Sequence, residues 1–458
     1  MKALILLSSL GVISLLSEIF SFKKLLYPIV LLGLIGTLFV NVLDWNLTNT
    51  MFFGMMKVDH YAVAFSSVLI GVCILWYIMA YDYFTEESNQ TDRTALIIFA
   101  LVGGVIMTSY TNMAMLFLGI EILSISVYVL AGSNKNDVHS NEAAFKYLIM
   151  GAFATGFLLF GITLIYGSTR SFDLAEIGNA ILINRGSISP IFYVGVLMML
   201  IGLLFKVSAA PFHFWAPDVY QGSPTVITAY MATIVKTAAF AAFLKLFMTC
   251  FATVGDVWMN IVWIVAALTL LVGNITAVLQ TSVKRMLAYS SVAHAGYMLL
   301  ALLAANYYSA SGILFYSLAY SIGSIASFGV LKIVAEANGN DSLDAFNGLG
   351  KRNPLLAFVM TVALLSLAGI PPTAGFFAKY YIFTAAFQAG YVGLVLIAII
   401  ASLVGVYYYF KIIIAMYFKA PTSETSIEVG MNHKLLFILI VLLTIVLGII
   451  PDFIIQLL

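Results

Sequence analysis

Apolar runs of about 20 residues recur along the whole chain, and their length restricts the fold more than any other feature. The hydrocarbon core of a bilayer is about 30 Å thick, and a helix that rises about 1.5 Å per residue crosses it in roughly 20 residues. Each run therefore predicts a spanning helix, and the chain is predicted to be an all-α, polytopic membrane protein. We place fourteen helices, near 3–20, 25–43, 60–81, 94–110, 112–131, 143–167, 190–210, 224–248, 257–279, 284–304, 309–335, 354–388, 391–417 and 433–457.

The composition agrees with a lipid environment. Hydrophobic residues make up 62% of the 458 residues and charged residues only 9%, whereas a soluble domain carries roughly a quarter charged residues. A net charge of +1 does not indicate a nucleic acid partner. Cys73 and Cys250 lie in separate apolar runs, so we predict buried thiols and no metal or disulfide. The sequence has no Walker, dinucleotide-binding or haem-attachment motif, so no cofactor is predicted in this chain.

The polar connections are too short to fold alone, which predicts one membrane domain. Two five-helix blocks are expected within it, and proline interrupts the fourth helix of each, at Pro211 and at Pro371 and Pro372. Because five is odd, the blocks would cross the membrane in opposite senses, as in the inverted repeats of transporters. The predicted divisions of the domain 1–458 are three N-terminal helices in 1–93, the blocks 94–248 and 257–417, and a C-terminal helix at 433–457.

Basic residues in the loops predict the orientation, since cytoplasmic loops carry an excess of lysine and arginine. Ten lie on one side of the predicted map, namely Lys23, Lys24, Arg93, Lys135, Lys284, Arg285, Lys351, Arg352, Lys419 and Lys434. Four lie on the other side, with both termini, namely Lys2, Lys57, Arg170 and Arg185. We therefore expect both termini outside the cytoplasm.

Ionisable residues in the middle of the predicted helices are the candidates for function, because an ionisable group at the bilayer centre costs at least about 2.5 kcal/mol on insertion scales. Glu121 is the only acid near the middle of any predicted helix. Lys236 lies near the centre of the eighth helix, too deep to extend easily to the membrane surface. A buried lysine can exchange its proton near neutral pH as a neighbouring carboxylate moves. Each group could instead be one half of a static ion pair.

Two further lysines lie beside the proline breaks. Lys206 precedes Pro211 by five residues, and Lys379 follows Pro372. A break leaves backbone groups unpaired, and such groups attract the water that a proton path requires. His294 lies in the middle of the tenth helix, where an imidazole with its ordinary pKa of about 6.5 is suited to passing protons between lysines. A structural role remains the alternative for all three.

Other polar residues have weaker claims. We regard His213, beside the first break, and Lys284, at the start of the tenth helix, as possible access residues. The alternative for Lys284 is plain anchoring at the membrane surface. Lys146, Lys245, Lys332 and Lys411 lie near enough to helix ends to reach the surface, and of these Lys146 and Lys411 are further access candidates. The run Tyr407, Tyr408 and Tyr409 is predicted to be part of an interfacial aromatic belt.

Three long segments carry a family resemblance. Residues 205–225 read FKVSAAPFHFWAPDVYQGSPT, residues 284–297 read KRMLAYSSVAHAGY, and residues 369–379 read GIPPTAGFFAK. These segments resemble the antiporter-like membrane subunits of bacterial NADH:quinone oxidoreductase, which is respiratory complex I. The resemblance covers the whole chain, and residues 217–222 are similar to the N-type form of these subunits.

The resemblance implies a function and a set of residues. Glu121, Lys206, Lys236, His294 and Lys379 match the family's positions in helices five, seven, eight, ten and twelve. It implies a proton pathway driven by quinone reduction elsewhere in the complex. NADH, FMN, iron–sulfur clusters and quinone are then expected in other subunits, and the partners are neighbouring membrane subunits in the bacterial inner membrane. Two other functions stay open at this point: a subunit of an Mrp-type sodium/proton antiporter, and a small-solute carrier.

Overall fold

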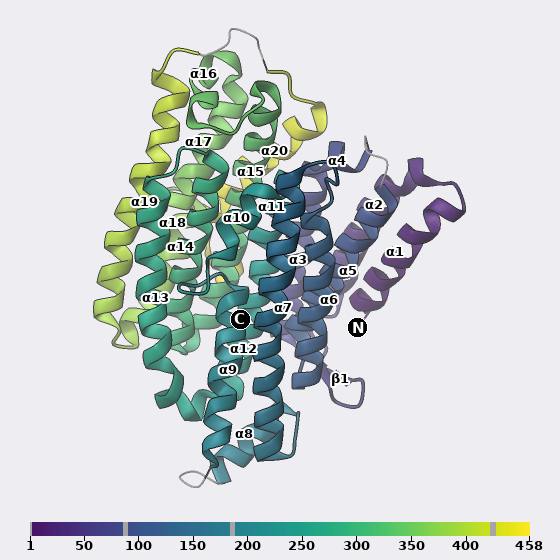
Figure 1. Cartoon of the computed structure of the whole chain (residues 1–458), viewed down its shortest axis with the longest axis vertical. Helices are drawn as coiled ribbons and strands as arrows, with labels where there is room; N and C mark the ends of the chain where they lie inside the picture. The colour runs from purple at the N-terminus through teal and green to yellow at the C-terminus, as the bar shows by residue number, and fades with distance from the viewer. Residues whose placement is uncertain (1, 86–89, 184–187, 422–426) are drawn as a thin grey trace.

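The computed structural model describes residues 2–85, 90–183, 188–421 and 427–458. The chain is mostly helical, as predicted, and its long helices run along one elongated bundle (Figure 1). Arg185, one of the loop residues counted above, lies outside the described residues. The first half contains α1 (Lys2–Ile19), α2 (Lys23–Leu43), β1 (Asn49–Met51), β2 (Met56–Val58), α3 (His60–Met79), α4 (Tyr81–Thr85), α5 (Gln90–Ser109), α6 (Met113–Ala131), α7 (Val138–Thr169), α8 (Leu174–Ile183), α9 (Pro190–Lys206), α10 (Trp215–Gly222) and α11 (Thr225–Tyr230). The second half contains η1 (Met231–Val235), α12 (Lys236–Thr249), η2 (Ala252–Val254), α13 (Gly255–Val278), α14 (Val283–Ala304), α15 (Tyr307–Asn338), η3 (Leu343–Phe346), α16 (Leu349–Arg352), α17 (Pro354–Ala368), α18 (Ala374–Gln388), α19 (Val392–Phe418), α20 (Met431–Ile449) and α21 (Asp452–Ile455).

Among the described residues, 12 helices are long and apolar enough to cross a membrane. The seventh and twelfth predicted spans are not in this set, because each is interrupted where proline was expected to break it. The first corresponds to α9, which ends at Lys206, and the second is divided between α17 and α18. The chain is a multi-pass membrane protein, and its two incomplete helices are the ones beside the candidate lysines.

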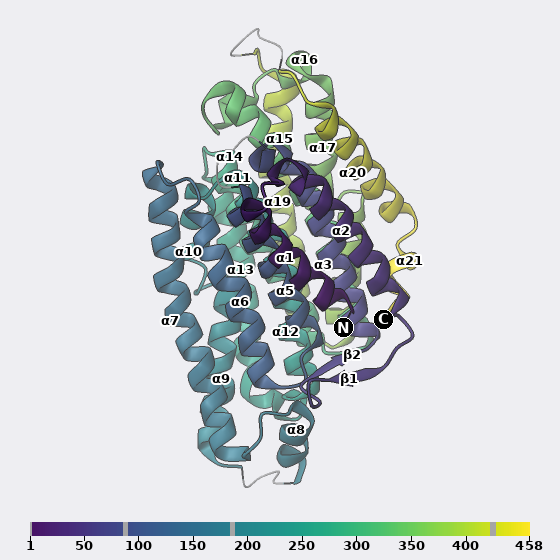
Figure 2. The same ribbon diagram turned by 90° about the vertical axis from the view of Figure 1, so that its right-hand side faces the viewer.

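The two ends of the bundle differ. Strands β1 and β2 form an antiparallel hairpin, in which Asn49 pairs with Val58. The hairpin and α8 lie at one end of the molecule in both views, and α16 lies at the other (Figure 1, Figure 2). We call the first the hairpin end. Sequence analysis predicted neither element. Residues 168–189 were expected to be a polar connection, but α8 forms within them because Leu174, Ile177 and Ile181 bury one side of it.

Side chains complete the hydrogen bonding at the first break. After α9 ends, the backbone amide of Ala210 donates to Oγ1 of Thr269 on α13, 2.9 Å away. Nε1 of Trp215, at the start of α10, donates to the carbonyl of Phe205 at 3.1 Å. A buried backbone group without a partner is costly, so these contacts stabilise an interruption that would otherwise be unfavourable within the bilayer.

The second break depends on glycine. Gly369 follows α17 with a φ of +85°, a conformation that other residues adopt only with strain. At the start of α18, the amide of Gly375 donates to Oγ of Ser366 at 3.1 Å. A Cβ at Gly375 would lie 1.7 Å from the backbone oxygen of Ser366, so no other residue fits without moving the backbone. The two helix halves are thus packed directly against each other.

The centre of the bundle is formed by the helices that carry the candidate residues. The continuous helix from α11 to α12 is buried throughout its apolar window, and α14 is almost as fully buried, whereas α1, α2 and α7 are mostly exposed on their outer faces. Residues 231–235 form one turn of π-helix, η1, immediately before Lys236. Polar groups in the buried middle of α12 and α14, such as Lys236 and His294, must therefore find partners inside the protein.

Candidate functional site

The structure divides the five predicted site residues into two groups. Glu121 on α6 and Lys206 at the end of α9 form one group, and Glu121 acts electrostatically on Lys206. Lys236, His294 and Lys379 form the other, since both lysines act electrostatically on the imidazole. The three lysines and the histidine are all more than nine-tenths buried. No hydrogen bond among the described residues joins one group to the other.

Lys206 has a hydroxyl partner and a nearby carboxylate. Its Nζ donates to Oγ of Ser124 on α6 at 2.5 Å and lies 5.9 Å from the centre of the Tyr128 ring. Oε1 of Glu121 is buried and has no hydrogen-bond partner among the described residues. A cavity of about 10 Å³ adjoins Lys206, Tyr128 and Thr155 of α7, which is about the space that one water molecule needs. This side of the site therefore holds a poorly partnered acid beside a buried amine.

Lys236 donates to two oxygens of one residue. Its Nζ lies 2.5 Å from the carbonyl oxygen and 2.6 Å from Oγ of Ser291 on α14. No carboxylate in the described part of the chain lies within ion-pair distance of this ammonium. The contacts of this lysine are thus with a serine of the helix packed against it, and not with the carboxylate considered in the sequence analysis.

His294 stands between two tyrosines. Its Nδ1 lies 2.7 Å from Oη of Tyr316 on α15, and its Nε2 lies 3.2 Å from Oη of Tyr409 on α19. The Tyr409 hydroxyl also bonds to Oγ of Ser290, one residue before the partner of Lys236. A histidine nitrogen can donate or accept depending on its tautomer. The imidazole is thus held at both nitrogens by groups that can donate and accept protons.

Lys379 binds the broken end of α17. Its Nζ donates at 2.7 Å both to the carbonyl of Ala368 and to Oγ of Ser402 on α19. The last carbonyls of a helix lack partners and carry partial negative charge, so they attract a cation. A cavity of about 10 Å³ is lined by Lys379, His294 and Tyr316. Since the cavity has room for about one water molecule, the lysine and the histidine can share a bridging water.

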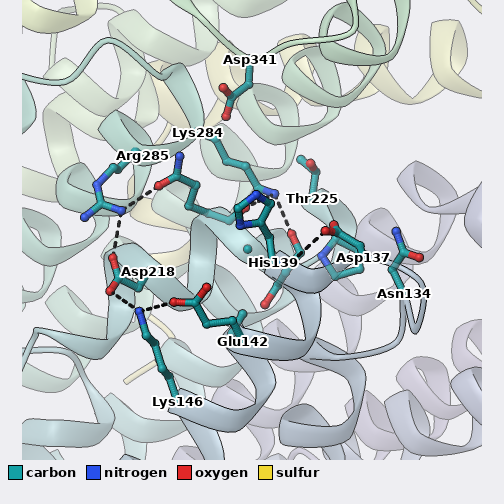
Figure 3. A pocket seen from close by; sticks show the side chains of 15 residues that line it. Asn134, Asp137, His139, Glu142, Lys146, Asp218, Thr225, Lys284, Arg285 and Asp341 are labelled. Carbon is teal, nitrogen blue, oxygen red and sulfur yellow. Dashed lines mark hydrogen bonds and ion pairs between the residues drawn. The ribbon is translucent and has the colours of Figure 1, made fainter.

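A roomy cavity is lined by residues of α7, α10 and α14 and of the segments beside them (Figure 3). It measures about 480 Å³, and we call it the vestibule; its lining includes Lys146, Asp218, Gln221, Lys284, Arg285 and Asp341. Asp218 bridges two cations across it, with Lys146 Nζ at 3.0 Å and Arg285 Nη1 at 2.9 Å. Asp218 lies outside the spanning helices. Partial burial would raise the pKa of its carboxyl, but hydrogen bonds from Lys146 and Arg285 outweigh this and hold the pKa below its usual range.

The four possible access residues are not all together, and Lys411 of α19 lines a separate small cavity with Tyr408. Lys146 and Lys284 line the vestibule, where Lys284 Nζ donates to the carbonyls of Gln221 and Ser223 at 2.9 and 2.6 Å. Lys284 therefore holds the C-terminus of α10 as well as facing the cavity. His213 does not line the vestibule. Its ring lies against Phe214 beside the first break, and its buried Nδ1 has no partner among the described residues.

Sequence analysis missed some interior residues and misplaced others. Tyr408 and Tyr409 are buried and only Tyr407 is exposed, so the prediction of an interfacial belt is wrong for two of the three. Lys332 is buried and pairs with Asp82 at 2.9 Å, so it does not extend to the surface. The serines that hold the lysines carried no signal in the sequence, because serine is common along the whole chain.

Comparison with known proteins places this geometry in a family. The chain is 46% identical to NADH-quinone oxidoreductase subunit N of Cytophaga hutchinsonii, over 100% of its own length and 99% of that protein. The family described as NADH:quinone oxidoreductase/Mrp antiporter, TM, matches residues 110–405, which is more than half of the chain. The chain belongs to this family. The resemblance inferred from the three sequence segments is confirmed.

Solved structures show where this antiporter-family fold recurs. A chain of respiratory complex I from Thermus thermophilus is 32% identical, with a TM-score of 0.85 and coverage of 99% of this chain and 98% of that one. A chain of the Mrp complex from a Dietzia species has a TM-score of 0.88 at 20% identity, with coverage of 100% and 96%. At that identity, the second comparison shows a shared fold alone.

Proposed function

We propose that the chain is the antiporter-like subunit N of a bacterial NADH:quinone oxidoreductase, and that it moves protons across the membrane. The observation that carries this proposal is the buried series of lysines and a histidine, each bonded to hydroxyl groups that can donate and accept protons. Such groups are expensive within a bilayer and mark ion pathways. The relatives that bear the name subunit N match over the whole chain, which supports the choice of complex.

The architecture of this proposal has fourteen spans. Twelve are the continuous helices; α9 with the turn that follows it, and α17 with α18, supply the other two. We further propose that the blocks 94–248 and 257–417 are inverted repeats, preceded by the helices of 1–93 and followed by that of 433–457. Their interrupted members support this division. We also propose that both termini lie in the periplasm, which the excess of basic loop residues at the end away from the hairpin supports.

In this proposal, protons pass along the buried residues by coupled titration. Glu121 and Lys206 exchange charge on one side, while Lys236, His294 and Lys379 do so on the other. A proton that arrives at one group changes the proton affinity of the next. The two cavities beside Lys206 and Lys379 support water-bridged transfer at both ends of the series. Between the groups, water would have to complete the path.

The vestibule is the proposed entrance. Lys284 and Lys146 line it, and Tyr220 is the buried residue that precedes the lining residue Gln221 in the chain. The Tyr220 side chain lies beside that of Ser291, which holds Lys236. A route from the vestibule to the central lysine thus needs few steps. His213 lies beside the first break. Its proposed partner is water at that break, and it is not part of the entrance.

The redox chemistry is proposed to occur in other subunits. NADH, FMN, iron–sulfur clusters and quinone would be bound there, and quinone reduction would drive the charge changes in this chain. Neighbouring membrane subunits of the same complex are the proposed partners. An Mrp-type antiporter shares the fold but has no redox partner, so purifying the complex from native membranes and assaying flavin content and NADH:quinone activity separates the two functions.

Lys236→Arg tests the relay directly. Arginine keeps its charge and cannot release a proton, so we expect Lys236→Arg to pump fewer protons per NADH oxidised. We expect the same result for Lys236→Ala and Glu121→Ala. All three variants should still assemble into the complex. The measurement is proton uptake against NADH oxidation in reconstituted vesicles. Lys332→Arg is the matched control, because Lys332 is also buried but is paired with Asp82. If Lys236→Arg keeps the wild-type ratio, this lysine is a static counter-ion.

A further inference from the structure

A fourth lysine, the partly buried Lys245, lies on the same helix as Lys236 but in different surroundings. It follows Lys236 by nine residues, which places it about 13.5 Å further along α12, toward the hairpin end. Its Nζ donates to the carbonyl of Thr108 on α5 at 3.1 Å. The same Nζ lies 5.7 Å from the ring centre of Tyr61 and 5.5 Å from that of Tyr110. The ammonium therefore contacts groups inside the protein, although the residue as a whole is partly exposed.

Nothing that contacts this ammonium is placed to take its proton. A backbone carbonyl does not become protonated near neutral pH, and an aromatic face stabilises a cation but not a neutral amine. The hydroxyls of both tyrosines point elsewhere, since Tyr61 donates to the carbonyl of Ala241 and Tyr110 to that of Ala242, each at 2.7 Å. The three lysines of the proposed relay differ, because each donates to a serine hydroxyl.

Water has a place just beyond Lys245. A cavity of about 30 Å³ adjoins Thr108, the residue whose carbonyl holds the ammonium, and it is also lined by Asn41, Ser66 and Ser109. The hairpin borders this cavity through Met56 and Val58. Such a volume exceeds what one water needs, and the four polar residues of its otherwise apolar lining can bond to water. Lys245 does not line the cavity itself, and Thr108 lies between the ammonium and this potential water site.

We propose that Lys245 is a fixed positive charge that blocks proton leakage at the hairpin end of α12. Fixed cations in a narrow passage exclude protons and other cations electrostatically. The two rings and the carbonyl hold the charge in place. Asp59 acts on the ammonium electrostatically and favours its charged form, and no described group in direct contact with it is placed to accept its proton. This inference rests on the proposed proton-translocating function. It adds to that function a residue whose fixed positive charge repels protons and which does not carry a proton along the path.

The test uses the whole complex reconstituted in vesicles. NADH oxidation first builds a pH gradient, an inhibitor of quinone reduction then stops it, and a pH-sensitive dye follows the decay. We expect Lys245→Gln to speed the complex-dependent decay by about tenfold, as loss of one unit charge near the path predicts. Lys245→Arg keeps the charge, so it should retain both the slow decay and the wild-type proton-to-electron ratio. Arg170→Gln, a matched charge loss at an exposed position of the same end, should change neither.

Each outcome decides between a barrier and a relay. If Lys245→Arg lowers the proton-to-electron ratio, Lys245 must deprotonate and the proposal is overturned. It is also overturned if Lys245→Gln holds the gradient as well as the wild type. Should the Gln variant fail to assemble, the ratio measured for the Arg variant decides alone. Loss of pumping in the wild-type complex would instead count against the proposed function, and the gradient for the decay assay could then be imposed by an acid pulse.

Discussion

Tyr409→Phe removes one oxygen from the centre of the site. That oxygen contacts Nε2 of His294 at 3.2 Å and the hydroxyl of Ser290. Phenylalanine preserves the ring, which packs against Tyr408 with centroids 4.5 Å apart. Each lost hydrogen bond contributes about 0.5–1.5 kcal/mol net, so the two together contribute about 1–3 kcal/mol. If protons pass through this hydroxyl, a barrier higher by that amount slows transfer by on the order of ten- to a hundredfold.

The assay compares proton uptake with NADH oxidation in vesicles that contain the assembled complex. We expect Tyr409→Phe to lower the number of protons pumped per NADH. Tyr407→Phe is the matched control, because it makes the same chemical change two residues away on a side chain that is 62% exposed. Equal ratios for the two variants would refute the inference that the Tyr409 hydroxyl belongs to the path.

Two further predictions concern stability. Gly375→Ala places a Cβ 1.7 Å from the backbone oxygen of Ser366, so it should destabilise the second break by at least about 1–3 kcal/mol and lower the thermal unfolding midpoint of the purified complex. Gly393→Ala, where an added Cβ meets nothing within 4 Å, should leave that midpoint unchanged. Asp218→Asn should cost less than about 1 kcal/mol, since its pairs are partly exposed. Because the folded pKa of Asp218 is depressed, its contribution is present at neutral pH and is lost as the pH falls through that folded pKa. The difference between variant and wild type, measured by thermal unfolding, should therefore shrink with acid and with added salt.

The depth of a residue in the bundle was predictable from sequence, but its partner was not. Lys236 was placed near the centre of its helix, and it is 2% exposed. The run length that predicts a span also fixes how far a residue lies from either surface. Which residue faces it depends on how α12 packs against α14, and that packing brings Ser291 to the ammonium. Nothing in the local sequence distinguishes this serine from its neighbours.

Faces of helices were harder to assign than their ends. Consecutive helical residues point about 100° apart, so the three tyrosines of α19 cannot share one environment. Tyr407 faces outward and Tyr409 faces the core, but a uniformly apolar helix has no polar side from which to predict this. Lys245 shows the same limit. Its distance from the helix end allows it to reach the surface, yet the rings of Tyr61 and Tyr110 hold its ammonium inside.

The π-helical turn before Lys236 has a consequence for how this helix can change during evolution. A single π turn corresponds to one extra residue within an otherwise regular α-helix. Deleting one residue from 231–235 would restore regular α-helix while leaving both flanking halves facing the same neighbours. Such a deletion would remove the local widening of the backbone beside Lys236 without rotating the rest of α12. A length difference of one residue between homologous helices at this point would therefore record the gain or loss of the π turn, at little cost to the fold around it.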